Sequence, residues 1–414
     1  MNKISRAAFL RIVACLLGAI VLGGCATSSS RRAPAPLLLV SLDAFRWDYC
    51  ALHPAETPNL HRLLREGISA KQLVPVFPSN TFANHYTLVT GLYPSHHGII
   101  NNEFFDPKLG EFFHYNRAVS AQKSQWWDGE PIWVTASRQG RKTASSFWVG
   151  SEAEIHGVRP NFWKPYSADI PFEQRFEELL GWLHLPPPER PELITFYLEE
   201  GNSVGHKYGP DSPELIATIK TLDVRVGAIV DRLNSEGIAA NIVVVSDHGM
   251  TPISTSRVLL LDPYVESAKV QVDFDGPVAG LRPLDGDVAT LLGKLAALPH
   301  ATVYARENLP TRFHITDNPR NPPVWIVPEE GWEIYFEARF NQYRNKFNRA
   351  DHGYDPAFES MRGILIAHGP AFKSSGAAIE PVENIHVYNL LCAALRLKPA
   401  PNDGDNRLVR QMLR

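Results

Sequence analysis

Polar residues follow three apolar runs of the sequence, at the points where buried strands would end. They are Asp43, the pair Asn202 and His206, and the pair Asp247 and His248. In an open α/β sheet, the loops beyond the carboxyl ends of the strands form the ligand-binding crevice, so we expect these side chains to converge. Carboxylate and imidazole together suit zinc-type metals. The spacing therefore predicts a metal site.

Each of these residues has a simpler interpretation when it is taken alone. An aspartate after a strand commonly caps a helix or closes an Asx-turn. With 15 histidines in the chain, most must be packed or surface residues. Acidic groups and imidazoles occur together after several of the predicted strands, and this coincidence favours the metal site.

Thr81 lies between a strand-to-loop passage and a helical run that Gly91 closes, in "SNTFANHYTLVTG". The free N–H groups and the dipole at a helix N-terminus favour an anion such as phosphate. A hydroxyl is a poor nucleophile unless something holds it as an alkoxide, and a metal ion does this. Thr81 is therefore a candidate nucleophile, and a role as N-cap only is the alternative.

The elements that must position these residues are predicted from periodicity. Runs rich in β-branched residues, apolar on both faces, predict buried parallel strands at 36–42, 192–198, 241–246 and 363–368. Amphipathic stretches predict helices at 57–66, 82–90, 171–183, 213–234 and 385–396. The alternation predicts an α/β fold, a mostly parallel sheet with helices on both faces.

A change in the sequence pattern divides the folded part. Residues 254–345 set short strand-like runs among Pro and Gly around one helical stretch, 286–297. We interpret them as a smaller inserted α+β subdomain, and 36–253 with 346–414 as the catalytic α/β domain. The 414 residues are 44% hydrophobic and carry a formal net charge of −3. This composition supports a large core and predicts no nucleic-acid polymer as partner.

The N-terminus predicts export. Residues 1–24 combine basic residues with an apolar run that is short for a membrane span, which is typical of a signal peptide. "LGGC" resembles a bacterial lipoprotein box that would place a lipid anchor on Cys25, with 25–35 as a tether. We expect attachment to the cell envelope, at the outer membrane and facing the periplasm. The alternative is a cleaved export signal with Cys25 incidental.

Two cysteines remain in the folded part, Cys50 and Cys392. An exported compartment permits them to pair, but two cysteines are no disulfide framework. The sequence leaves open whether they form a disulfide or two buried thiols.

Five blocks follow one another along nearly the whole mature chain: "LVSLDAFRWDY", "FPSNTFANHYTLVTGLYPSHHGIINN", "YLEEGNSVGHKYGPDS", "VVVSDHGMT" and "HGYDPAFESMRGILIAHGPAF". They resemble the nucleotide pyrophosphatase/phosphodiesterase family of the alkaline phosphatase superfamily. The resemblance implies an alkaline-phosphatase-like fold, two zinc ions and hydrolysis of small-molecule phosphodiesters.

The resemblance also implies a role for each matching residue. Thr81 would be the covalent nucleophile, and Asn102 would donate to a non-bridging phosphate oxygen. Phe82 and Tyr197 would sandwich the nucleobase or another leaving group. One zinc ion would be held by Asp43, Thr81, Asp247 and His248, and the other by Asn202, His206 and His352. Two such ions stabilise both the attacking and the leaving oxygen of an in-line displacement at phosphorus.

The chain departs from the family pattern at Asn202, where the family has an aspartate. An amide oxygen can coordinate zinc but brings no charge, which predicts weaker binding of the second ion. Glu199 or Glu200 could compensate, although alternation along a strand makes it improbable that both face the site.

Two alternatives to a nucleotide phosphodiesterase stay open. One is a phospholipid phosphodiesterase acting on choline phosphoesters, because lipid-cleaving relatives share the metal site. The other is a metal-poor pseudoenzyme that binds its ligand without turnover, for which Asn202 is the only support. The natural substrate and the oligomeric state are not determined by the sequence.

Overall fold

The computed structural model describes residues 34–414, of which Ala35–Arg414 form one compact unit. The predicted signal peptide and the lipid anchor on Cys25 lie outside the described residues. Within residues 34–414, no helix is both long and apolar enough to cross a bilayer.

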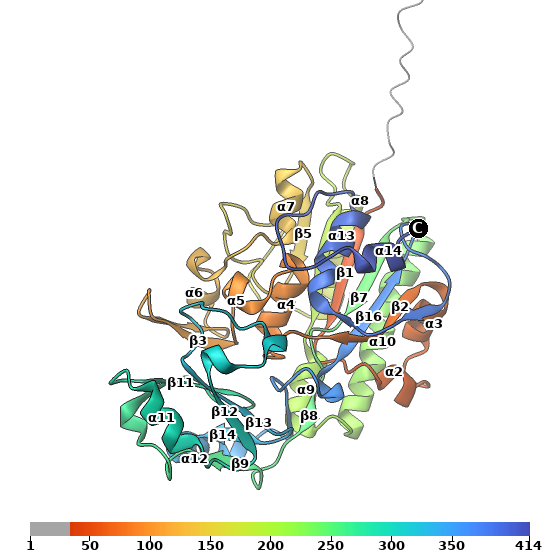
Figure 1. Cartoon of the computed structure of the whole chain (residues 1–414). Coiled ribbons are helices and arrows are strands. Elements are labelled where there is room, and N and C mark those ends of the chain that lie inside the picture. Colours follow the sequence, from red (N-terminus) through yellow and green to blue (C-terminus); the bar gives the residue numbers. More distant parts are fainter. Residues whose placement is uncertain (1–33) are drawn as a thin grey trace, which may run out of the picture. The chain divides into compact units, whose positions relative to one another are not determined.

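One large sheet organises this unit (Figure 1). Its strands lie in the order β17-β2-β16-β7-β1-β6-β5, with β18 paired to β2. Their bounds are β1 Leu37–Leu42, β2 Ile68–Val74, β5 Thr143–Ser146, β6 Leu193–Leu198, β7 Asn241–Val245, β16 Gly363–His368, β17 Ala377–Ile379 and β18 Val382–Glu383. The central strands β1, β6 and β7 are buried throughout and pair in parallel, as their uninterrupted apolar runs predict.

The prediction that β16 is a parallel strand is wrong. β16 runs antiparallel to both of its neighbours, β2 and β7. An apolar run reports burial on both faces and carries no information about strand direction, so the pattern could not distinguish the two cases. Because of the reversal, the amino end of β16 lies at the edge of the sheet where β7 ends, with Leu365 opposite Val245.

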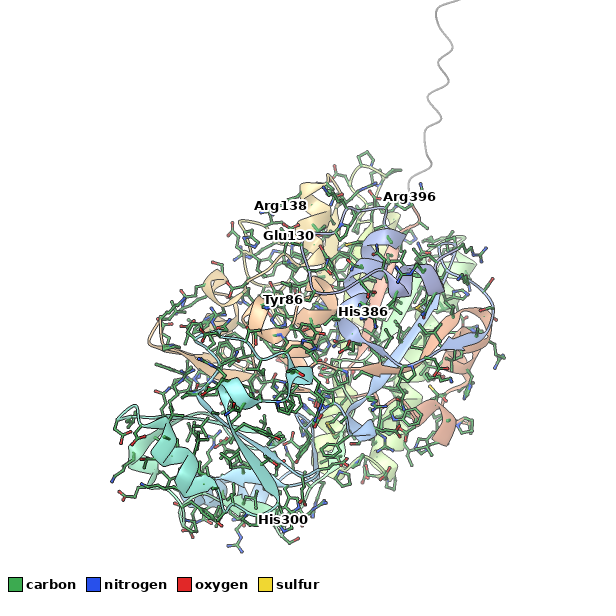
Figure 2. All side chains as sticks on the ribbon, in the orientation of Figure 1. Tyr86, Glu130, Arg138, His300, His386 and Arg396 are labelled. Atoms are coloured by element: carbon green, nitrogen blue, oxygen red, sulfur yellow. The ribbon has the colours of Figure 1, made fainter. Side chains whose placement is uncertain are left out.

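Helices cover both faces of the sheet, as predicted. Successive residues of β1 point to opposite faces, so that Leu37 and Leu39 join one hydrophobic cluster and Leu38 and Val40 the other. The second cluster is covered by α3 (Pro58–Glu66), α8 (Phe172–His184) and α10 (Pro213–Ser235), and the first by α4 (Thr81–Thr90), α7 (Ile132–Arg138) and α13 (Val387–Ala394). Tyr86 of α4 and His386, which precedes α13, are both buried (Figure 2).

Local signals set the ends of the helices that matter for the site. Ser212 caps α10 by accepting from the Leu215 N–H at 3.2 Å, with Pro213 in the first turn. α4 ends at Gly91, whose φ of +67° is a conformation that glycine adopts without strain. The predicted helix starts and stops are therefore within a few residues of the observed ones.

The segment between β7 and β16 contains a second sheet, drawn in teal in Figure 1. Four strands pair antiparallel in the order β10-β11-β13-β12, and α11 packs on them through Leu291 and Leu295. Their bounds are β10 Val270–Phe274, β11 Ala279–Pro283, α11 Val288–Leu295, β12 Ala301–Ala305 and β13 Val324–Pro328. Further elements are α2 Tyr49–Leu52, β3 Glu103–Asp106, β4 Glu111–His114, α9 Glu200–Tyr208, β8 Thr251–Pro252, β9 Val258–Leu260, β14 Glu333–Tyr335, α12 Glu337–Tyr343, β15 Ala350–Asp351 and α14 Arg407–Met412.

Cys50 and Cys392 are free and buried. Burial raises the pKa of each thiol to about 12, so neither carries a reactive thiolate at neutral pH. We expect neither to react with a maleimide in the folded protein and both to react in guanidinium chloride, as measured by peptide mass mapping. Rapid labelling of either cysteine in the folded protein would contradict this prediction.

Candidate metal centre and active site

The first group of predicted ligands gathers at the carboxyl edge of the sheet. Asp43 follows β1, Asp247 and His248 follow β7, and Thr81 is the first residue of α4. The Nε2 atom of His248 lies 3.1 Å from Thr81 Oγ1, 3.1 Å from Asp247 Oδ2 and 3.6 Å from Asp43 Oδ1. All four side chains are buried, with Thr81 the most exposed at 7%. These four residues therefore meet as predicted.

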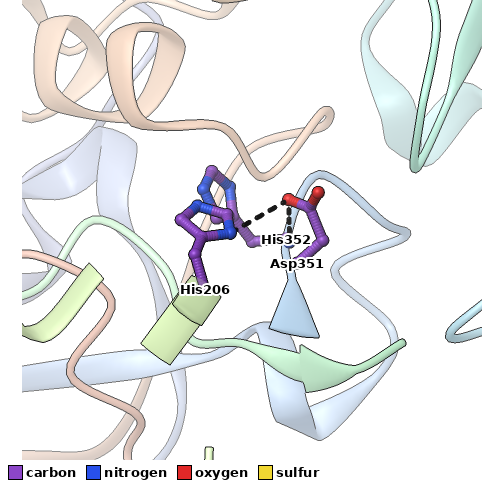
Figure 3. Close-up of side chains that lie close together, drawn as sticks. All are labelled: His206, Asp351 and His352. Carbon is purple, nitrogen blue, oxygen red and sulfur yellow. Dashed lines mark hydrogen bonds and ion pairs between the residues drawn. The ribbon is translucent and has the colours of Figure 1, made fainter. Parts of the chain in front are cut away.

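The second group lies directly beside the first. His206 is carried by α9 one turn after Asn202, so both lie on the same side of that helix. His352 follows β15, and its ring stacks on that of His248 with 3.7 Å between centroids. The ring of His206 lies 5.1 Å from that of His352. His206, Asp351 and His352 offer ligand atoms within 4.8 Å of one another, as Asp43, Asp247 and His248 do (Figure 3).

The orientation of the three histidines fits metal binding. The Nδ1 atom of His206 lies 2.9 Å from the Ala350 carbonyl, that of His248 2.8 Å from the Gly249 carbonyl, and that of His352 3.2 Å from the Ser79 carbonyl. A carbonyl only accepts, so in the neutral ring each Nδ1 carries the proton and each Nε2 presents its lone pair. Histidines that bind metals usually donate their other N–H in this way.

Buried oxygens that have no hydrogen-bond donor also indicate that cations bind here. Asp43 Oδ1, Asp247 Oδ2 and Asn202 Oδ1 are buried and have no hydrogen-bond partner among the described residues. Buried polar atoms are nearly always satisfied, so unpaired acceptors gathered beside imidazole lone pairs need an explanation. Zinc ions fit this set of oxygen and nitrogen donors.

Burial and proximity set the electrostatics of the site. Burial, and then the Asp247 carboxylate, raise the pKa of Asp43 well above its usual value. Burial also acts to raise the pKa of Asp247, but His248 and His85 outweigh it and lower this pKa well below its usual value. Burial, followed by His248 and His206, lowers the pKa of His352 well below its usual value. His352 is thus neutral, which is the form that binds metal.

Two residues of the site were not predicted. The Nδ1 atom of His85 lies 2.9 Å from the Thr81 carbonyl and 3.1 Å from Asp247 Oδ2, and its Nε2 atom lies 2.8 Å from Ser41 Oγ, so this ring packs beside the Asp247 carboxylate. Asp351 belongs to the second group. A signal for each existed: His85 stands one helical turn after Thr81, and Asp351 forms an Asp-His pair with His352 like that of Asp247 and His248.

The proposed compensating carboxylates do not belong to either group. Glu199 and Glu200 lie at the start of α9, beyond the end of β6, so the alternation argument does not apply to them. Glu200 pairs with Arg225, and Glu199 accepts from the Tyr166 hydroxyl at 3.2 Å. Both side chains are held by partners of their own.

A cavity of about 510 Å³ opens onto the site. Its lining includes Asp43, Thr81, Asn202, His206 and His352, together with the aromatic residues Phe82, Tyr115, Phe147, Trp148, Tyr166 and Tyr197. The Tyr197 hydroxyl donates to Asp43 Oδ2, a contact that the sequence did not predict. Asn102 also lines the cavity, and its Oδ1 accepts from the Phe82 N–H at 2.9 Å. The predicted nucleophile, the substrate-contacting residues and all of the predicted ligands except Asp247 and His248 therefore line one cavity.

A family model described as type I phosphodiesterase / nucleotide pyrophosphatase matches residues 37–355. The chain belongs to this family. Its match to the venom phosphodiesterase of Macrovipera lebetinus is 38% identical over 94% of this chain and 47% of that protein. Human ectonucleotide pyrophosphatase/phosphodiesterase family member 1 is 37% identical over 92% of this chain and 42% of that protein. The chain thus spans about half the length of these relatives.

Solved structures of the family share the fold. Murine ectonucleotide pyrophosphatase/phosphodiesterase 5 superposes with a TM-score of 0.86 and 34% identity, over 92% of this chain and 100% of that one. An inactive variant of the murine protein in complex with AMP gives the same values. These matches confirm the predicted family and the alkaline-phosphatase-like α/β fold.

Zinc is expected to stabilise the folded protein by binding between carboxylates that otherwise repel each other. Zinc at 100 times its dissociation constant would add about 2.7 kcal/mol. Adding zinc to chelator-treated protein should therefore raise the midpoint of thermal unfolding measured by circular dichroism, and Asp43→Asn should reduce the rise. Asp273→Asn, which alters a buried carboxylate paired with Arg282 elsewhere, should keep it. A full rise in Asp43→Asn would refute this assignment of ligands.

Proposed function

We propose that the chain is an exported, zinc-dependent phosphodiesterase/pyrophosphatase that cleaves nucleotide-type phosphodiesters through a threonyl-phosphate intermediate. The observation that carries the proposal is the place of Thr81. Its hydroxyl lies 3.1 Å from His248 Nε2, at the N-terminus of α4 and on the wall of the 510 Å³ cavity.

The residues around Thr81 suit a phosphate group. The N-cap position of α4 is Asn80, whose side chain makes no capping hydrogen bond, so the first-turn N–H groups other than that of Phe82 remain available to an anion. The Asn102 amide oxygen is fixed by the Phe82 N–H. The Asn102 Nδ2 group is then the part of the amide that can donate to a non-bridging phosphate oxygen.

The reaction is a double displacement at phosphorus. Thr81 Oγ1 forms a bond to phosphorus while the bond to the leaving alcohol or nucleotide oxygen breaks, and the proton lost from the Thr81 hydroxyl is balanced by protonation of the leaving oxygen. Water then cleaves the Thr81–phosphate bond, which releases a phosphate monoester and restores the hydroxyl. When bound, two zinc ions would supply Lewis-acid stabilisation of the attacking and leaving oxygens.

Three observations support a nucleotide as substrate and export as the destination. Aromatic side chains, Phe82 among them, line the cavity beside Thr81, and flat rings favour stacking with a base. The murine relative was solved with AMP. The names of the relatives describe a venom enzyme and ectoenzymes, which agrees with the export that the sequence predicts.

Loss of the nucleophile should abolish turnover while Asp43, Asp247 and His248 remain to bind the metal. Thr81→Ala is expected to lower kcat on bis-p-nitrophenyl phosphate by on the order of 1000-fold or more, measured by p-nitrophenol release with added zinc. Thr81→Ser, which keeps the hydroxyl, should retain part of the activity. No turnover by the wild type at any zinc concentration would instead support a binding protein.

Stacking of the base on Phe82 predicts a selective loss in Phe82→Ala. Base–aromatic stacking contributes about 1–3 kcal/mol, so kcat/KM for p-nitrophenyl thymidine 5′-phosphate should fall about 5- to 150-fold, and less for methyl p-nitrophenyl phosphate. Phe112→Ala is the matched control, because Phe112 is 37% exposed on β4 and does not line the cavity. Equal losses on both substrates would contradict base stacking, and faster hydrolysis of glycerophosphocholine would contradict the nucleotide assignment.

A further inference from the structure

The two predicted zinc sites differ in charge. The site at Asp43, Asp247 and His248 contains two carboxylates, whereas His206, His352 and Asn202 are all neutral as ligands. The Asn202 amide oxygen is buried and unpaired, so it is available to a cation. Three neutral ligands leave the charge of a divalent ion uncompensated in a partly buried place, which is unfavourable.

Among the described residues, Asp351 is the carboxylate that forms a group of possible metal ligands with His206 and His352. Its Oδ1 atom lies 3.9 Å from His206 Nδ1 and accepts from the His352 backbone N–H at 2.8 Å (Figure 3). Its side chain is 17% exposed. Asp351 ends β15, which pairs with β8, so the backbone that carries it is fixed. The Asp351 carboxylate thus lies near the His206 ring and is fixed by the backbone of His352.

The carboxylate faces the protonated side of His206. The Nδ1 atom of this ring lies 2.9 Å from the Ala350 carbonyl, and Nε2 is the nitrogen left for the metal. A carboxylate behind a metal-binding imidazole raises the basicity of the ring and improves binding of the ion. Glu199 and Glu200, the other candidates near Asn202, are held by Tyr166 and Arg225.

We propose that Asp351 is a positioning residue that supplies, from behind His206, the negative charge that Asn202 does not provide to the second zinc ion. The proposal rests on the zinc sites of the proposed function. It explains how this chain retains a second cation site while lacking an aspartate at position 202.

The test is a double-mutant cycle on zinc affinity, which moves the charge from one residue to the other. Zinc dissociation constants are measured by competition with a chromogenic chelator on the full chain, and zinc content by elemental analysis. Asp351→Asn should weaken the second site about 10- to 100-fold. In an Asn202→Asp background the same substitution should reduce zinc affinity less, because a charged ligand is then present. The double variant Asn202→Asp/Asp351→Asn should bind zinc at least as tightly as the wild type.

Asp275→Asn is the matched control. Asp275 lines the neighbouring cavity of about 520 Å³ together with Asp351 but belongs to neither ligand group, so its substitution should leave zinc affinity unchanged. The proposal is overturned if Asp351→Asn binds zinc as tightly as Asp275→Asn does. It is also overturned if Asp351→Asn reduces zinc affinity equally in the wild-type and the Asn202→Asp backgrounds. Failure of the double variant to bind a second ion would overturn it as well.

The same measurements separate this proposal from the proposed function. A wild-type protein that holds two zinc ions and hydrolyses bis-p-nitrophenyl phosphate, with Asp351→Asn unchanged, refutes the role of Asp351 alone. A wild-type protein that neither binds zinc nor hydrolyses the diester refutes both.

Discussion

Two aspartates buried side by side at the edge of the main sheet are the constraint on which the rest of the site depends. Asp43 and Asp247 are at most 1% exposed, and each keeps one buried oxygen without a donor. Removing two carboxylates from water is costly unless positive charge compensates them. The two carboxylates are therefore stable side by side only when cations or protons lie close to them. They attract this positive charge to the place beside Thr81.

Neighbouring side chains hold these carboxylates in place. Tyr197 donates to the second oxygen of Asp43, and the Ala44 N–H lies 3.3 Å from Asp247 Oδ1. His85 contacts Asp247 on one side and Ser41 on the other. Tyr197 and the Ala44 N–H contact Asp43 Oδ2 and Asp247 Oδ1, whereas His85 Nδ1 and His248 Nε2 both lie 3.1 Å from Asp247 Oδ2. Because the side chains of the site are already fixed by their surroundings, they lose little conformational freedom when the substrate binds.

The direction of one strand brings the second set of ligands to the same edge. β16 runs antiparallel to β7, so the chain arrives at the carboxyl edge before it enters β16. His352 stands in that arriving segment and stacks on His248. Had β16 been parallel, the residues preceding it would have arrived at the opposite edge of the sheet, away from Asp247. The reversal brings the two groups of candidate metal ligands next to each other.

The sequence by itself determined which segments are buried and which polar residues end them. Uninterrupted apolar runs identify β1, β6 and β7 because burial on both faces leaves a one-dimensional pattern, and Gly91 and Ser212 mark helix ends because their roles are local. The motif blocks identified the family, and with it Thr81 and the ligands expected around it.

Tertiary structure alone decided the direction of β16, the contacts of His85 and Tyr197, and the place of Asp351 behind His206. Strand direction, hydrogen-bond partners and distances between charges depend on segments that lie more than 100 residues apart in several cases, as Asp351 and His206 do. Such pairings are fixed by packing, which no local pattern of residue types records.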